Sequence, residues 1–205
     1  MRIIGGRASG IRLAVPDSNE IRPTEDRVKE TMFSILGDLS GSCVVDLYSG
    51  TGALGLEALS RGASDVYLVE RNSRHLAVMK KNIEAVCKSI GQEKCGRVNV
   101  ISSDVRTAWM QLKHSGVMAD IILADPPYDV VQGAFGGVEL ASSNDYASLA
   151  GENTIFVLEC RTGTELPWFP EGPWRMIRCS TTGIRTVCFS RLASAFPEEE
   201  SEDEI

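Results

Sequence analysis

The stretch CVVDLYSGTGALGLEALSRG occupies residues 43–62 and passes from an apolar run through a glycine-rich turn into a helix-like segment. Residues 43–48 have the length and composition of a buried strand. Residues 53–59 are rich in helix-forming side chains and are followed by Gly62, a common helix terminator. A strand that leads through a tight turn into a helix is the first unit of a parallel sheet with helical crossovers. The stretch therefore predicts an α/β fold.

The rest of the chain continues this alternation. Further strands are expected at residues 65–70, 98–101, 119–124 and 154–159, and helices at residues 73–90 and 105–112. Short crossovers between such strands make them parallel. Near the C-terminus, residues 174–179 and 186–191 have strand composition and flank the Thr182-Gly183 turn, which predicts an antiparallel hairpin at one sheet edge. The expected fold is a Rossmann-like, mostly parallel, seven-stranded sheet with helices on both faces.

The length and charge of the chain bound its organisation. With 205 residues, 43% hydrophobic and 24% charged, we expect one sheet domain over residues 41–192. Residues 1–40 form a basic arm and a helix, which is expected over residues 24–36. The net charge is −7, but residues 198–204 alone carry six acids and no base. They belong to an acidic tail, residues 193–205, that we expect to be disordered.

Other classes of protein are disfavoured by what the chain lacks. No apolar run approaches the length of a membrane span and no secretory signal is apparent, so a cytoplasmic protein without a membrane partner is expected. The six cysteines include no C-x-x-C pair and the two histidines show no metal-ligand pattern, so neither a bound metal nor a disulfide framework is expected. The basic N-terminus instead suggests contact with a polyanion.

The glycine-rich turn predicts a cofactor site. Asp46 ends the first strand, while Gly50 and Gly52 precede a helix N-terminus, where glycine lets the backbone approach a ligand closely. Residues 50–55, GTGALG, also match the G-x-G-x-x-G pattern of nicotinamide-dinucleotide proteins, which leaves an NAD-dependent oxidoreductase as an alternative. A carboxylate beside the turn would repel a pyrophosphate, but it suits the amino-acid end and the positive charge of S-adenosylmethionine. Charge complementarity therefore favours S-adenosylmethionine.

Two more carboxylates follow strand ends. Glu70 can accept hydrogen bonds from the two ribose hydroxyls of either cofactor. Asp104 can accept a hydrogen bond from the adenine amine, can cap the helix that follows it, or can do both. The residues expected to contact the cofactor are Asp46, Tyr48, Ser49, Gly50, Gly52, Glu70, Arg71, Asp104 and Val105.

The segment Asp125-Pro126-Pro127-Tyr128 directly follows the fourth strand, at the edge where open parallel sheets bind ligands. Its two prolines fix the backbone, so the Asp125 carboxylate and the Pro126 carbonyl are held in set directions. Together they can accept the hydrogens of an exocyclic amine and localise its lone pair, while Tyr128 stacks on the ring that carries the amine. The alternative is an ordinary turn. All four residues are predicted to form a catalytic segment for methylation of a planar amine.

The tetrapeptide resembles the [D/N/S]-P-P-[Y/F/W] motif of class I S-adenosylmethionine-dependent methyltransferases that act on nitrogens of planar groups. The segments MRIIGG at residues 1–6, RPTEDRVKE at residues 22–30 and DLYSGTGALGLEALSRG at residues 46–62 extend the resemblance to the bacterial ribosomal-RNA small-subunit methyltransferase D family. The resemblance covers about residues 1–191. One departure is Thr182, which stands where similar proteins have a tyrosine before the hairpin glycine.

This resemblance implies methylation of the exocyclic N2 amine of one guanine in 16S ribosomal RNA. The partner would be naked ribosomal RNA or a partly assembled small subunit, and a monomeric enzyme is expected. The arm residues that would contact RNA phosphates are Arg2, Arg7, Arg12, Arg22 and Arg27. Arg22 and Arg27 can equally pair with Glu25, Asp26 or the sheet edge. A DNA adenine or cytosine amino-methyltransferase shares the chemistry, but 205 residues leave little room for a separate target-recognition region.

Overall fold

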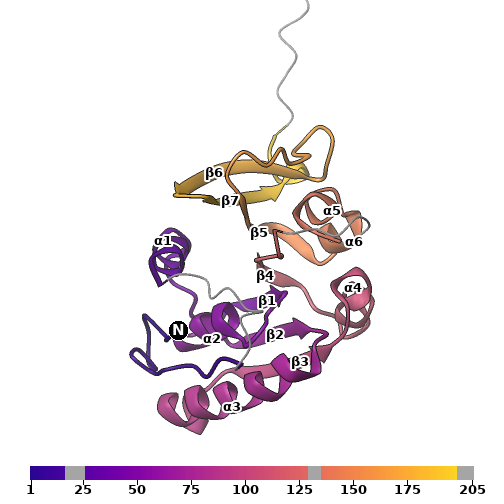
Figure 1. The fold of residues 1–205 in the computed structure, drawn as a ribbon. Coiled ribbons are helices and arrows are strands. Elements are labelled where there is room, and N and C mark those ends of the chain that lie inside the picture. The colour runs from indigo at the N-terminus through magenta and orange to yellow at the C-terminus, as the bar shows by residue number, and fades with distance from the viewer. Residues whose placement is uncertain (17–25, 129–134, 198–205) are drawn as a thin grey trace, which may run out of the picture.

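The computed structural model describes residues 1–16, 26–128 and 135–197, and its core is one seven-stranded sheet (Figure 1). The strand order is β3-β2-β1-β4-β5-β7-β6, in which β7 pairs antiparallel with both β5 and β6 and the other pairs are parallel. The strands are β1 (Cys43–Leu47), β2 (Asp65–Glu70), β3 (Arg97–Ser102), β4 (Ala119–Ala124), β5 (Ala150–Arg161), β6 (Trp174–Thr182) and β7 (Arg185–Leu192). The predicted mostly parallel sheet with a C-terminal hairpin at one edge is confirmed.

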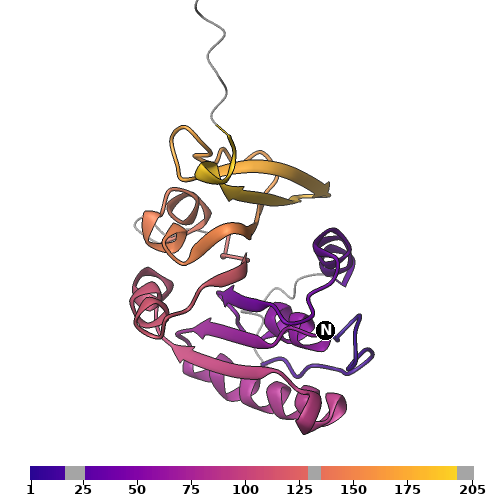
Figure 2. The same cartoon turned by 180° about the vertical axis from the view of Figure 1, so that it is seen from behind.

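Helices cover both faces of the sheet, as expected. They are α1 (Asp26–Leu36), α2 (Ala53–Ser60), α3 (Ser73–Ile90), α4 (Val105–His114), α5 (Gly137–Ala141) and α6 (Asn144–Ala147). The strands send alternate side chains to two apolar clusters: Val44 packs with α1, α2 and α3, whereas Val45 and Leu47 pack with α4, α5 and α6. Figure 2 shows the same layers from behind.

Four segments differ from the expectation. The short helices α5 and α6 were not predicted, and β5 begins at Ala150 instead of residue 154. In the expected disordered tail, Ala193–Ala195 form a 3-10 turn and the ring of Phe196 lies 4.9 Å from the Arg175 guanidinium carbon. Residues 193–197 are therefore part of the fold, whereas the acidic residues 198–204 lie outside the described ranges.

The N-terminal arm folds back on itself as a narrow hairpin. Arg2 and Arg12 form a β-bridge, and Ile3 exchanges backbone hydrogen bonds with Gly10 and Ile11. At the turn, Gly6 has a φ of +76°, and a side-chain carbon there would lie 2.1 Å from the Ser60 carbonyl oxygen, so only glycine fits. The arm is thus docked on the C-terminal end of α2.

A fully buried ion pair joins the arm, α1 and α2. The Glu57 carboxylate accepts hydrogen bonds from the amides of Ile4 and Gly5, both at 2.8 Å, and from Arg61 Nε at 2.9 Å. Lys29 Nζ donates to the Arg2 carbonyl at 2.5 Å and lies 3.7 Å from Glu57 Oε2. Burial lowers the pKa of Lys29, and Glu57 opposes that effect. Lys29 belongs to the RPTEDRVKE segment, so part of that motif serves to attach the arm.

Replacing Lys29 should weaken this attachment. We expect Lys29→Met to lower the free energy of unfolding by about 2 kcal/mol, because the Arg2 carbonyl and Glu57 lose a buried charged donor. Urea denaturation measures the change, with Lys80→Met on the exposed side of α3 as the matched control. Equal stability of the two variants would contradict a stabilising role for the pair.

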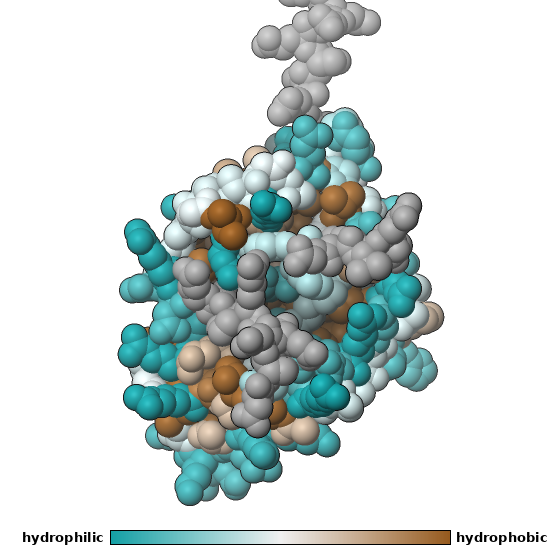
Figure 3. Space-filling view, viewed as in Figure 1, coloured by the Kyte–Doolittle hydropathy of each residue, from teal (hydrophilic) through white to brown (hydrophobic). Residues whose placement is uncertain are grey.

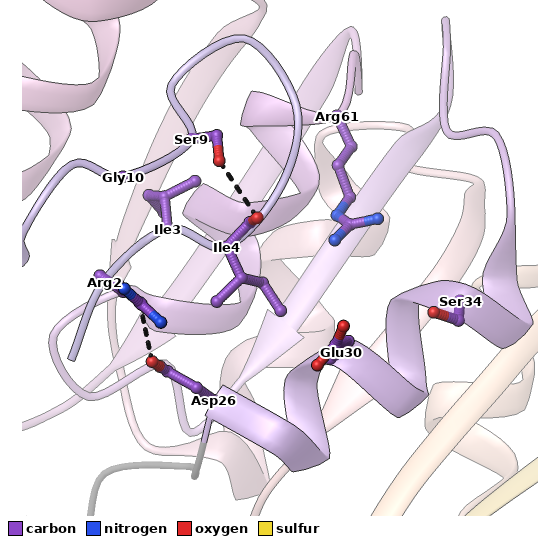
Figure 4. A pocket seen from close by; sticks show the side chains of 9 residues that line it. All are labelled: Arg2, Ile3, Ile4, Ser9, Gly10, Asp26, Glu30, Ser34 and Arg61. Carbon is purple, nitrogen blue, oxygen red and sulfur yellow. Dashed lines mark hydrogen bonds and ion pairs between the residues drawn. The ribbon is translucent and has the colours of Figure 1, made fainter.

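A hollow of about 410 Å³ lies between the arm hairpin, α1 and Arg61 (Figure 4). The hydrogen bond from Arg2 Nε to Asp26 crosses one side of it at 3.0 Å, and Ser9 Oγ donates to the Ile4 carbonyl at 3.1 Å. On the face seen in Figure 3, hydrophilic residues lie around most of the outline of the molecule. Among the described residues, no helix combines the length and the apolar character required to cross a bilayer.

Candidate active site

The parallel strands bring the predicted functional carboxylates to one edge of the sheet. Asp46 is the last but one residue of β1, Glu70 is the last residue of β2, and Asp125 directly follows β4. The three are close enough that the charges of Asp125 and Glu70 contribute to raising the pKa of Asp46. In Figures 1 and 2 the arrowheads of β1 and β2 point toward this edge and away from the N-terminal arm.

The turn between β1 and α2 is held in an unusual backbone conformation. Tyr48, Gly50 and Gly52 have φ values of +60°, +55° and +89°, and Tyr48 is the one non-glycine residue with positive φ among the described residues. Ser49 fixes the turn, because its amide donates to the Val69 carbonyl at 2.9 Å and its hydroxyl donates to the Asp46 carbonyl at 2.6 Å. A strained, well-anchored turn of this kind is frequent where a backbone contacts a ligand.

Asp46 is fully buried beneath this turn. Its Oδ2 accepts a hydrogen bond from the Gly55 amide at 2.9 Å, while Oδ1 is buried without a hydrogen-bond partner among the described residues. Burial is the main cause that raises the pKa of Asp46 to about 7. A buried carboxylate with an open acceptor is suited to a cationic ligand. The buried acceptor beside this turn therefore fits the positively charged cofactor expected from the sequence.

Glu70 organises the backbone around the turn. Its Oε2 accepts from the Gly50 amide at 2.9 Å, and its Oε1 accepts from the amides of Arg71 and Asn72 at 2.8 and 2.7 Å. Two carboxylate oxygens have about four acceptor positions, so one is left after these three bonds. The predicted ribose contact stays a prediction, and Glu70 also has a structural role that the sequence did not indicate.

Asp104 caps the N-terminus of α4, which was one of the two interpretations of this residue. Its side chain accepts from the Arg106 amide at 3.0 Å and from Arg71 Nη1 at 2.6 Å. The side-chain hydrogen bond from Arg106 is the main cause that holds the pKa of Asp104 far below its usual range. Val105 is buried and its carbonyl accepts a hydrogen bond from the Tyr146 hydroxyl. Contact of Asp104, Arg71 or Val105 with the cofactor stays a prediction.

The tetrapeptide after β4 is half inside the molecule. Pro126 is buried, Pro127 is exposed, and Asp125 and Tyr128 are half-buried. The Tyr128 hydroxyl donates to Glu159 Oε1 at 2.6 Å, and Arg185 Nη1 donates to the same oxygen at 2.5 Å. Tyr128 is therefore tethered to β5 and β7, and it is not the free side chain of a simple surface turn.

Glu159 and Arg185 were not predicted from the sequence as site residues. One signal was available for Glu159, because it ends the apolar run TIFVLE just as Asp46 and Glu70 end theirs. Arg185 gave no such signal, since its role depends on the pairing of β7 with β5. Tyr48 also gains a partner that the sequence did not indicate: its hydroxyl donates to the Phe135 carbonyl.

Two of the arm arginines bind other parts of the fold. Arg7 Nη1 donates to the Lys94 carbonyl at 3.1 Å, at the end of the sheet opposite the β1 and β2 arrowheads. Arg2 pairs with Asp26, while Arg12 and Arg27 are exposed. Arg22 lies outside the described residues. Arg2 and Arg7 are thus held by other parts of the fold, and contact of the arm arginines with RNA stays a prediction.

Comparisons with known proteins agree over nearly the whole chain. The model of the family described as "Conserved hypothetical protein 95" matches residues 1–191. Ribosomal RNA small subunit methyltransferase D of Escherichia coli K12 is 35% identical over 186 residues, which are 89% of this chain and 85% of that protein. Its namesake in Haemophilus influenzae is 31% identical over 186 residues, 90% of each chain.

Solved structures agree with the fold. The Escherichia coli protein yhhF has a TM-score of 0.71 and 30% identity, covering 94% of this chain and 98% of that one. A hypothetical protein from Thermus thermophilus has a TM-score of 0.74 at 24% identity, with 94% and 99% covered. Because the family model and both relatives match most of the length, this chain belongs to the same family as the ribosomal RNA small subunit methyltransferases D.

Proposed function

We propose that the protein transfers the methyl group of S-adenosylmethionine to the exocyclic N2 amine of a guanine in 16S ribosomal RNA. The observation that supports this most is the closeness of Asp125 to the buried Asp46 of the glycine-rich turn, in a chain whose relatives are ribosomal RNA methyltransferases. The NAD-dependent alternative is not retained, because the family is one of methyltransferases. The domain carrying this activity would be residues 41–192.

The residues of the turn would hold the cofactor, which supplies an electrophilic methyl group on a sulfonium. Asp46 Oδ1 offers an open buried acceptor, Gly50 and Gly52 leave the backbone uncovered, and Glu70 keeps one acceptor position beyond its three backbone bonds. Asp104 is charged at neutral pH, because the two arginines beside it hold its pKa low. These carboxylate acceptors suit a ligand that carries a positive charge and several hydroxyl and amine donors.

Asp125 and Tyr128 would act on the base. An aromatic amine is a weak nucleophile because its lone pair is delocalised into the ring. The Asp125 carboxylate and the Pro126 carbonyl would accept the two amine hydrogens and so localise the lone pair on nitrogen. As the new N–C bond would form, the S–CH3 bond of the sulfonium would break and leave a neutral thioether, and the amine would pass one proton along its hydrogen bond to the Asp125 carboxylate. Tyr128 would stack on the base, which contributes about 1–3 kcal/mol to binding.

The partner would be ribosomal RNA, either naked or in a partly assembled small subunit, and we propose a monomer that works in the cytoplasm, where that RNA is found. The exposed arginines Arg12 and Arg27 and the exposed ends of Arg2 and Arg7 would contribute salt-sensitive phosphate contacts.

Transfer of a labelled methyl group tests the proposal. Purified protein is incubated with labelled S-adenosylmethionine and, in parallel, with 16S RNA, small subunits from cells lacking the enzyme, and duplex DNA. We expect label in RNA or subunits, located by mass spectrometry at the N2 of one guanine. Label at another position of RNA would overturn the guanine assignment, and label in duplex DNA alone would favour the DNA enzyme.

A further inference from the structure

Three side chains from separate elements converge beside the tetrapeptide. Tyr128 follows β4, Glu159 lies in β5, and Arg185 is the first residue of β7. In the β5–β7 ladder, Glu159 is opposite Val187, so Arg185 is its diagonal neighbour on the same face of the sheet. The tyrosine hydroxyl and the arginine guanidinium both donate to Glu159 Oε1, at 2.6 and 2.5 Å.

The burial of this cluster makes its geometry hard to change. Glu159 is 0% exposed and Arg185 is 9% exposed. Separating two buried charges leaves each one unpaired in a medium of low dielectric constant, which is strongly unfavourable. The hydrogen bond from the Tyr128 hydroxyl adds a second constraint, because it ends on the same Glu159 oxygen as the bond from Arg185. Burial and the nearby Glu159 carboxylate raise the pKa of Tyr128, so its phenol is protonated and donates at neutral pH.

The guanidinium also occupies one side of the tyrosine ring. The Arg185 guanidinium carbon lies 5.8 Å from the centroid of the Tyr128 ring, within the range of a cation–π contact. A base that stacks on Tyr128 must therefore use the opposite face of the ring. The hydroxyl bond to Glu159 fixes the phenol end, so the face left for the base has a set direction.

We propose that Glu159 and Arg185 form a positioning pair, which holds the Tyr128 ring ready to stack on the target base with one face only. The inference rests on the proposed function of the tetrapeptide and adds two residues to it. A ring that is already fixed loses no rotational freedom when the base binds, and it places the amine at a constant distance from Asp125. Pairing with Arg185 also neutralises Glu159, so this buried acid does not repel RNA.

Three variants test the pair through methyl transfer to the RNA or subunit substrate. Tyr128→Phe removes only the hydroxyl, and we expect kcat to fall about tenfold while KM for RNA changes less than about twofold. Glu159→Gln keeps one acceptor oxygen but loses the charge that pairs with Arg185, so kcat should fall less, about threefold. Arg185→Lys keeps the charge but loses the planar group, and kcat should fall about fivefold. The matched control is Arg161→Lys, because Arg161 lies opposite Arg185 in the ladder and is exposed.

The double variant Tyr128→Phe/Glu159→Gln separates positioning from general stability. If both residues act through the same bond, the double variant should be no slower than the slower single variant. If the double variant lost kcat by the product of the two single-variant losses, or if Tyr128→Phe had a normal kcat, the proposal would be overturned. Thermal unfolding shows whether Glu159→Gln folds; if it does not, Tyr128→Phe and Arg185→Lys decide the question.

A second measurement is independent of activity. The chain has four tyrosines, so ring-labelled tyrosine gives a simple NMR spectrum in which the flipping of Tyr128 can be followed. We expect a slowly flipping ring in the native protein and fast flipping in Arg185→Lys and Glu159→Gln. Fast flipping in the native protein would refute the pair. If native protein methylated no RNA but its Tyr128 ring were fixed, the proposed function would fail while the pair would stand.

Discussion

Asp125→Ala is expected to lower kcat by about 1000-fold, with the dissociation constant of S-adenosylmethionine changed by less than about twofold. Asp125 follows β4, whose last residues are buried and paired on both sides with β1 and β5, so its carboxylate is held on a rigid strand end. A preorganised acceptor of this kind does most of its work as the amine loses its planarity. Its removal should therefore slow transfer without disturbing the turn after β1.

The measurement combines single-turnover methyl transfer with calorimetric titration of the cofactor. Asp125→Asn retains one acceptor oxygen and should lose less, about 100-fold. Asp145→Ala is the matched control, because Asp145 is an exposed acid in α6. A normal kcat in Asp125→Ala would remove the acceptor role from this residue and, with it, the proposed chemistry of the tetrapeptide.

Asp46→Asn is expected to weaken S-adenosylmethionine binding by about 100-fold, which corresponds to about 3 kcal/mol for a unit charge about 5 Å away at an effective dielectric constant of about 20. The same variant should flatten the dependence of cofactor affinity on pH. In the free protein, burial raises the pKa of Asp46 to about 7, so the carboxyl is partly protonated at neutral pH. A cationic ligand favours the ionised form, and native affinity should rise with pH up to about 7 and then level off.

The effect of Asp46 on stability has the opposite direction. Because its pKa is raised by folding, the neutral carboxyl stabilises the folded state at low pH, and this contribution is lost as pH rises through about 7. Asp46→Asn cannot ionise, so its stability should fall less between pH 4 and pH 7 than that of the native protein.

Calorimetry in buffers of different ionisation enthalpy measures the proton released on cofactor binding. A native affinity that does not depend on pH would show that Asp46 is not the group facing the charge.

The sequence was sufficient for elements with clear boundaries. Residues 65–70, 73–90 and 119–124 were predicted with the same ends that the structure shows, because each is a continuous run with a turn signal at both ends. The helices α5 and α6 are too short for a helical period to be visible. They follow residues 129–134, which lie outside the described ranges.

The residues of the candidate site could be predicted where they lie at the ends of strands. Asp46, Glu70 and Asp125 could be assigned because parallel strands finish at one edge of a sheet. The contacts of Glu159 with Arg185 and of Lys29 with Glu57 join segments that are far apart in the sequence, and no local pattern reports such contacts. For that reason Lys29 received no role from the sequence, although it is buried against α2 and helps to attach the arm.

The docking of the N-terminal arm also sets an order of events during synthesis. Residues 1–14 leave the ribosome before their partners do, because Ala14 is held by the side chain of Asn82 and Arg7 by the carbonyl of Lys94. The arm therefore has no place to settle until α3 and the turn after it have emerged. A nascent chain must therefore keep residues 1–14 unattached while the eighty residues that follow them are still being made.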